Sequence, residues 1–125
     1  MVIGFLANSF AAESNEIKFG ADGKFKIMHV TDTHLEDYNL EASVWAIGEA
    51  CDIEKPDIVT ITGDNVQNCK NSEDTKKLID SLMNVFETRN IPVAVTFGNH
   101  DSEAGAMTRE ELMALLQHFL MLRFR

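Results

Sequence analysis

The sequence lacks several features that would place it in a specialised class. It has only two cysteines, Cys51 and Cys69, and their spacing is not that of a metal-binding motif. No internal repeat and no low-complexity linker divides its 125 residues. Lysine and arginine total 11 against 20 aspartate and glutamate residues, and no basic cluster offsets the net charge of -9. Nucleic acid held through its phosphates is therefore not an expected partner.

The composition is that of a single globular domain. Apolar residues make up 45% of the chain and charged residues 25%, so neither disorder nor a membrane span is expected. A domain of this length buries about two-thirds of the surface that its unfolded chain exposes. An acidic chain can still bind phosphate groups if a metal ion reverses the local sign of the charge.

The first residues can be interpreted in two ways. The stretch MVIGFLANSFAAES is a short apolar run followed by small residues, and a signal peptidase would accept a site after Ala11 or Ala12. The basic residues that normally precede such a run are missing, and the run is too short to span a bilayer. Residues 1–15 are thus either a clipped signal peptide or a disordered N-terminus, and residues 16–125 form the domain. A residual signal peptide over residues 1–12 would imply a secreted or periplasmic protein; otherwise a cytoplasmic one is expected.

Strand and helix patterns alternate along the chain from residue 17. A short strand at the start of this region is followed by a turn and by a longer strand from Phe25 to Thr31. The next segment is a helix with one buried side, because apolar residues recur at steps of four, three and four: Leu40, Val44, Ile47 and Cys51. Since Cys51 continues this stripe, buried thiols are favoured over a disulfide between Cys51 and Cys69.

The cycle then repeats twice. Segments 57–62 and 93–97 are rich in β-branched residues, as are strands buried on both faces of a parallel sheet. Ser72 is the expected N-cap of the helix between them. A last helix starts at Thr108, where Glu111 completes a capping box. The order βαβαβα predicts an α/β fold with a mostly parallel sheet and right-handed crossovers.

Polar motifs directly follow three of these strands. They are DTH at 32–34, GDN at 63–65 and GNHD at 98–101. Because ligands bind beyond the carboxyl ends of the strands in such sheets, the three motifs are expected at one rim. Each of the first two has an ordinary structural explanation, since Asp and Thr often end strands in turns. All three together, each after a strand, predict a functional site.

The residue types in these motifs suit a metal centre. The carboxylates of Asp32 and Asp64, the imidazole of His34 and the amide of Asn99 are oxygen and nitrogen ligands for Mn, Fe or Zn. Asp64, on the middle strand, is well placed to bridge two ions. Two metals that share a water lower its pKa and clamp the oxygens of a phosphate.

The GNHD motif adds a candidate proton donor. His100 suits the protonation of a leaving alkoxide, and the adjacent Asp101 is expected to orient its ring, so both are candidate catalytic residues. Gly63 and Gly98 allow the backbone to turn sharply after the strands, so that the side chains that follow point into the crevice.

These motifs resemble those of the calcineurin-like metallophosphoesterase family. Its blocks run D-x-H, G-D and G-N-H-[DE], and the match covers residues 25–105 in order, spacing and strand context. The stretches TGDN, FGNHDSE and TREELM are most similar to the branch related to small purple acid phosphatases. The resemblance implies a β-sandwich flanked by helices. It also implies hydrolysis of a small phosphomonoester or phosphodiester by a hydroxide that two divalent or trivalent metal ions (Mn, Fe or Zn) activate.

The resemblance also implies a role for each matching residue. Asp32 and His34 would bind the first metal, Asp64 would bridge both metals, and Asn99 would bind the second. His100 would contact the phosphate or protonate the leaving group.

The sequence departs from the family pattern in two places. Gln67 stands where many relatives carry an acid or a tyrosine, so a tyrosine-to-iron charge-transfer ligand is not expected. Two later histidine blocks are absent, so the chain is expected to be the N-terminal half of the domain, with its C-terminal half missing, and to be a fragment whose activity is uncertain. Two alternatives remain open: a non-catalytic metal- or phosphate-binding module, and a receiver-like domain whose acids bind Mg²⁺, although the latter does not explain GNHD.

The C-terminal segment LMALLQHFLMLRFR is apolar nearly all round a helix. Such a helix is normally covered on both sides, and too little of the chain remains to cover it. An exposed apolar patch would follow, and the expected consequence is either aggregation or a dimer that buries the patch.

Overall fold

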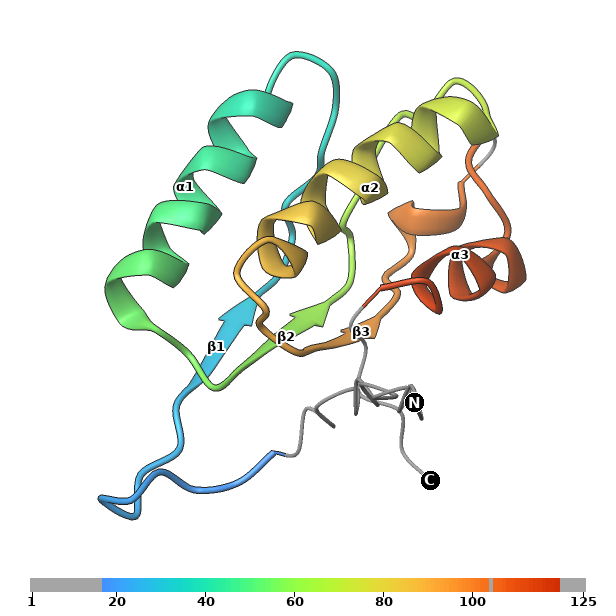
Figure 1. The fold of residues 1–125 in the computed structure, drawn as a ribbon. Helices are drawn as coiled ribbons and strands as arrows, with labels where there is room; N and C mark the ends of the chain where they lie inside the picture. Colours follow the sequence, from blue (N-terminus) through green and yellow to red (C-terminus); the bar gives the residue numbers. More distant parts are fainter. Residues whose placement is uncertain (1–16, 104, 120–125) are drawn as a thin grey trace, which may run out of the picture.

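The computed structural model describes residues 17–103 and 105–119. Within them, three parallel strands form one sheet in the order β1 (Ile27–Val30), β2 (Ile58–Thr62) and β3 (Val93–Thr96). Helices α1 (Leu40–Glu54) and α2 (Ser72–Glu87) are the crossovers, and both lie on the same face of the sheet (Figure 1). The predicted α/β fold with a parallel sheet is confirmed, whereas the residues described contain no second sheet of a sandwich. The two interpretations of residues 1–15 concern a segment outside the described residues.

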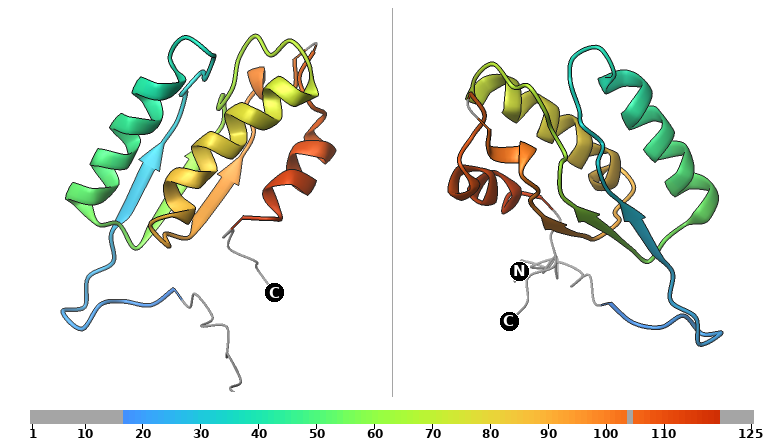
Figure 2. Two further views of the ribbon diagram at one scale, coloured as in Figure 1. Left: turned by 45° about the horizontal axis from the view of Figure 1, so that its top comes forward. Right: turned by 180° about the vertical axis from the view of Figure 1, so that it is seen from behind.

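A short 3₁₀ helix and a third α-helix follow the last strand. The 3₁₀ helix η1 (His100–Ser102) starts four residues after β3, and α3 (Arg109–Leu116) lies beyond the β3 edge of the sheet (Figures 1 and 2). Seen from behind, the strands lie in front of α1 and α2 (Figure 2, right). The polar motifs are therefore at the ends of a single, one-sided layer of strands.

The main core lies between this sheet and α2. On the sheet side, Val59, Ile61 and Val93 are at most 1% exposed, and on α2 Leu78 and Phe86 are equally buried. The alternating register of parallel strands puts these sheet residues on the helix face, because Val59 pairs with Val93. Burial of this apolar surface fixes the strands, and so the position of the residues that follow them.

Helix boundaries agree with the sequence patterns except at one cap. The Thr108 capping box is confirmed, since the backbone N–H of Thr108 donates to Oε2 of Glu111 at 2.8 Å and the N–H of Glu111 donates to Oγ1 of Thr108 at 3.2 Å. The prediction that Ser72 caps α2 is wrong. Asn71 is the N-cap, and its Oδ1 accepts from the N–H of Asp74 at 2.9 Å. Both side chains are good caps, and the extended backbone of Asn71 decides between them.

Two further predictions have clear outcomes. The short strand expected from residue 17 does not form. Residues 17–20 have no regular structure and precede a turn. Cys51 and Cys69 are both buried, free thiols, as the helical stripe predicted. No helix in the described ranges is long and apolar enough to cross a membrane.

The C-terminal helix is shorter than its apolar pattern suggested. α3 ends at Leu116, with Leu112 and Leu116 buried and Met113 41% exposed. The rest of the apolar segment from residue 120 lies outside the described residues. A dimer through this helix stays a prediction.

Candidate metal centre

The DTH and GDN motifs lie side by side beyond the ends of β1 and β2. Backbone hydrogen bonds continue past the strands, from the N–H of Asp32 to the carbonyl of Gly63 at 3.1 Å and from the N–H of His34 to the carbonyl of Asp64 at 3.0 Å. A bridge between Leu35 and Val66 extends the pairing further. The main chain alone therefore holds the two motifs in register.

Three of the predicted ligands come together at this rim. Asp32, His34 and Asp64 each offer one ligand atom, and these atoms all lie within 4.8 Å of one another. Nε2 of His34 is 3.7 Å from Oδ1 of Asp32. Nδ1 of His34 is buried and has no hydrogen-bond partner among the described residues. Two carboxylates and one imidazole suit a divalent cation with mixed oxygen and nitrogen ligands.

All three of these residues have an unusual backbone conformation. The φ angles are 52° at Asp32, 42° at His34 and 50° at Asp64, in the left-handed region that residues other than glycine rarely adopt. Each such residue costs about 1–3 kcal/mol, which the surrounding structure must offset, and such residues concentrate at functional sites. The three candidate ligands are half of the six non-glycine residues with a positive φ in the described part of the chain.

This conformation predicts a difference between two variants that both lack the Asp32 carboxylate. Asp32→Ala is expected to have a free energy of unfolding about 1 kcal/mol lower than Asp32→Gly, because only alanine is strained at positive φ. Urea denaturation followed by circular dichroism in EDTA measures the difference. Equal stabilities would show that residue 32 is not left-handed in solution.

The glycines that follow β2 and β3 permit a close approach of their two backbones. Gly63 has a φ of +103°, and a Cβ there would lie 2.4 Å from the backbone nitrogen of Gly98. A Cβ on Gly98 would lie only 2.1 Å from Oδ1 of Asp64. The Asp64 carboxylate therefore occupies the space that any side chain at position 98 would need.

The contacts of the Asp101 carboxylate differ from the predicted ones. It is fully buried, and its carboxylate accepts from the backbone N–H groups of Asn65, Val66 and Gly98 at 2.7, 3.1 and 2.8 Å. Nδ2 of Asn65 donates to the same carboxylate at 3.2 Å. Asp101 thus ties the GDN loop to the GNHD loop. The predicted contact with the ring of His100 is replaced by these bonds.

The ring of His100 contacts Glu103 instead. Nδ1 of His100 is 2.7 Å from Oε1 of Glu103, although the angle is too bent for an aligned hydrogen bond. This carboxylate, with smaller contributions from Asp64 and Asp101, raises the pKa of His100 above its usual value against the opposing effect of desolvation. The His100 ring also packs edge-to-face on His34, with 5.1 Å between centroids. His100 therefore lies next to the metal-ligand group.

Asn99 is exposed and is the N-cap residue of η1. It belongs to the same loop as His100, whose backbone N–H donates to Oδ1 of Asp64 at 2.9 Å. Its role as a ligand of a second metal stays a prediction. Arg109 also supports this loop, since its guanidinium donates to the carbonyl of Gly98 at 3.0 Å and to Oγ of Ser102 at 3.3 Å. Sequence patterns gave no signal for Glu103 or Arg109 beyond their short distance from the motif.

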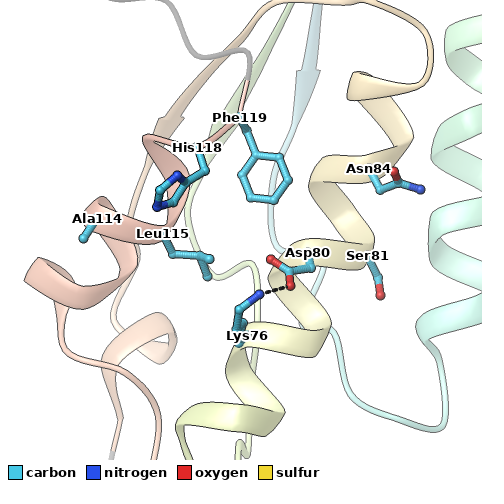
Figure 3. A pocket seen from close by; sticks show the side chains of 8 residues that line it. All are labelled: Lys76, Asp80, Ser81, Asn84, Ala114, Leu115, His118 and Phe119. Carbon is cyan, nitrogen blue, oxygen red and sulfur yellow. Dashed lines mark hydrogen bonds and ion pairs between the residues drawn. The ribbon is translucent and has the colours of Figure 1, made fainter.

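A separate hollow of about 710 Å³ lies between α2 and α3 (Figure 3). Its lining includes Leu115 and Phe119 on one side and a Lys76–Asp80 ion pair on the other. No predicted site residue lines it. His118 lines this hollow and is not among the residues that come together at the metal centre.

Comparison with known proteins identifies the family of this chain. A family model for calcineurin-like phosphoesterases matches residues 25–123. Phosphatase DCR2 of Saccharomyces cerevisiae is 31% identical over 106 residues, which are 73% of this chain and 18% of that protein. The probable inactive purple acid phosphatase 14 of Arabidopsis thaliana is 30% identical over 122 residues, which are 85% of this chain and 30% of that protein.

A bacterial relative shows the same partial coverage. The uncharacterized metallophosphoesterase YkuE of Bacillus subtilis is 33% identical over 95 residues, which are 71% of this chain and 30% of that protein. The chain thus spans less than a third of the length of these relatives. The match to a purple acid phosphatase agrees with the branch that the motifs predicted.

Proposed function

The chain belongs to the calcineurin-like phosphoesterase family, and on this basis we propose that it serves metal-dependent hydrolysis of small phosphomonoesters or phosphodiesters. The observation that carries the proposal is the meeting of ligand atoms from Asp32, His34 and Asp64 within 4.8 Å at the carboxyl edge of the sheet. Two of these residues come from one strand end and the third from its neighbour. Such a convergence of donors is what a family that uses divalent metals requires.

We assign the residues as follows. Asp32, His34 and Asp64 would hold a first metal, and Asp64 together with the amide of Asn99 would hold a second. Bound metals would supply a water of lowered pKa and neutralise the charge of the phosphate. His100, whose ring centroid lies 5.1 Å from that of His34, donates a proton to the departing oxygen.

A second function has a specific observation in its favour. The Arabidopsis relative is named a probable inactive purple acid phosphatase. The alternative is a module that binds metal or phosphate without turnover. It shares the Asp32, His34 and Asp64 group and differs only in the absence of hydrolysis.

The experiment that separates these functions measures turnover and metal content on the same sample. The chain loaded with Mn²⁺ is expected to hydrolyse a chromogenic phosphodiester or monoester, and His100→Ala is expected to lower kcat by roughly 10²- to 10⁴-fold. His118→Ala, which changes an exposed histidine of the α2–α3 hollow, is the matched control and should retain full activity. Stoichiometric metal by elemental analysis without turnover would reject hydrolysis and favour the binding module.

A further inference from the structure

We propose that Glu103 is a positioning residue that fixes the ring orientation and tautomer of His100. This inference rests on the proposed function for its catalytic consequence, but its structural part stands on the geometry of the GNHDSE loop. Oε1 of Glu103 lies 2.7 Å from Nδ1 of His100, and the two side chains are 43% and 29% exposed. The pair is thus partly shielded from water at the rim of the metal centre.

The 3₁₀ turn places the two side chains together. In a 3₁₀ helix, side chains at i and i+3 eclipse each other, and η1 starts at His100 and ends just before Glu103. The backbone of Glu103 is held on both sides, since its N–H donates to the carbonyl of His100 at 3.3 Å and its carbonyl accepts from Ala106 at 2.9 Å. The main chain that carries the carboxylate is therefore fixed, and it places Oε1 of Glu103 within 2.7 Å of Nδ1 of His100.

Other contacts hold the rest of His100 in place. The ring packs edge-to-face on His34 with an interplanar angle of 67°, and its backbone N–H donates to Oδ1 of Asp64. Below it, Asp101 is committed to the backbone of the GDN loop and of Gly98 and does not compete for the ring. Glu103 is the carboxylate that the described structure places on the ring of His100.

The contact has a chemical consequence for the neutral imidazole. A carboxylate at Nδ1 accepts a hydrogen bond only if Nδ1 carries the proton, so it favours the Nδ1–H tautomer. Nε2 is then the nitrogen left to accept from, or after protonation donate to, a ligand oxygen. Partners of this kind fix the tautomer and direction of functional histidines. Without Glu103, the ring would revert to the Nε2–H form that free imidazole side chains favour.

Nitrogen NMR of the metal-free chain tests the tautomer directly. With ¹⁵N-labelled histidine at alkaline pH, His100 is expected to show the Nδ1–H pattern in the wild type, to keep much of it in Glu103→Gln, whose amide oxygen can still accept, and to lose it in Glu103→Ala. Glu110→Gln, an exposed glutamate in the first turn of α3, is the control and should leave the pattern unchanged. An Nε2–H pattern in the wild type, or no change in Glu103→Ala, would overturn the proposal.

An activity measurement tests the catalytic consequence separately. Glu103→Ala is expected to lower kcat by roughly 10- to 100-fold with KM little changed, and Glu103→Gln to recover most of the loss. A merely structural role would instead lower thermal stability without moving the tautomer. If the wild type shows no turnover, the proposed function fails, while the NMR result still decides whether Glu103 positions His100. An altered tautomer with unchanged kcat would overturn the catalytic part alone.

Discussion

Replacing Asp101 by asparagine is expected to lower the free energy of unfolding by about 3 kcal/mol, although the two side chains have nearly the same shape. The carboxylate is fully buried and accepts four hydrogen bonds, three of them from backbone N–H groups. Asparagine keeps one acceptor oxygen and turns an NH₂ group toward the remaining donors. Buried donors that face another donor incur the full desolvation cost.

The measurement is urea denaturation of Asp101→Asn and of the wild type. An equal dependence of the unfolding free energy on urea concentration would confirm that only the stability has changed. Asp80→Asn is the control, because Asp80 lies in a surface ion pair with Lys76 and such pairs contribute at most about 1 kcal/mol. Loss of these hydrogen bonds should also free the GNHD loop, so the affinity for Mn²⁺ should fall together with the stability. A stability change no larger than that of Asp80→Asn would contradict the place assigned to Asp101.

Replacing Gly98 by alanine is expected to displace the Asp64 carboxylate from the metal centre. The added Cβ would lie 2.1 Å from Oδ1 and 2.6 Å from the backbone nitrogen of Asp64, distances at which the carboxylate must move. Displacement also breaks the bond from the N–H of His100 to Asp64. Because a ligand itself is displaced, Mn²⁺ affinity should fall by more than the roughly 10- to 100-fold that substitutions behind the ligands cause.

A second glycine provides the control for this prediction. Gly23 has a φ of +75°, but a Cβ there would meet no atom within 4 Å. Gly23→Ala therefore strains the backbone without crowding the metal centre, and it should lower stability while leaving Mn²⁺ affinity unchanged. Calorimetric titration of both variants measures the affinities. If Gly98→Ala bound Mn²⁺ as tightly as Gly23→Ala, the close packing of Gly98 on Asp64 would be wrong.

The sequence was sufficient for the fold because its signals were periodic and local. The stripe that ends at Cys51 and the capping box at Thr108 depend on spacing within one helix, and both are present. The cap of α2 was assigned to Ser72 and not to Asn71, since both residues are good caps and only the backbone conformation distinguishes them. The short strand expected from residue 17 failed because alternation alone does not supply a pairing partner.

The site could be predicted in outline for a related reason. The carboxyl ends of neighbouring parallel strands meet at one rim, and this rule alone brings Asp32 and His34, after β1, together with Asp64, after β2. Sequence could not show that all three are left-handed, nor that Asp101 turns inward while Glu103 reaches the ring of His100. The placements of Asp101 and Glu103 depend on the geometry of the 3₁₀ turn at His100–Ser102, and the left-handed conformations depend on the loops after β1 and β2; neither is specified by the spacing of residues in the sequence.

The central claim is that Asp32, His34 and Asp64 form one metal site, and a titration of the metal-free chain with Mn²⁺ tests it most directly. The loss of the electron paramagnetic resonance signal of free Mn²⁺ reports binding. We predict saturable binding that is strongly weakened in His34→Ala and in Asp64→Asn and that is unchanged in Asp80→Asn. Binding that does not saturate, or that is the same in all four proteins, would contradict the account.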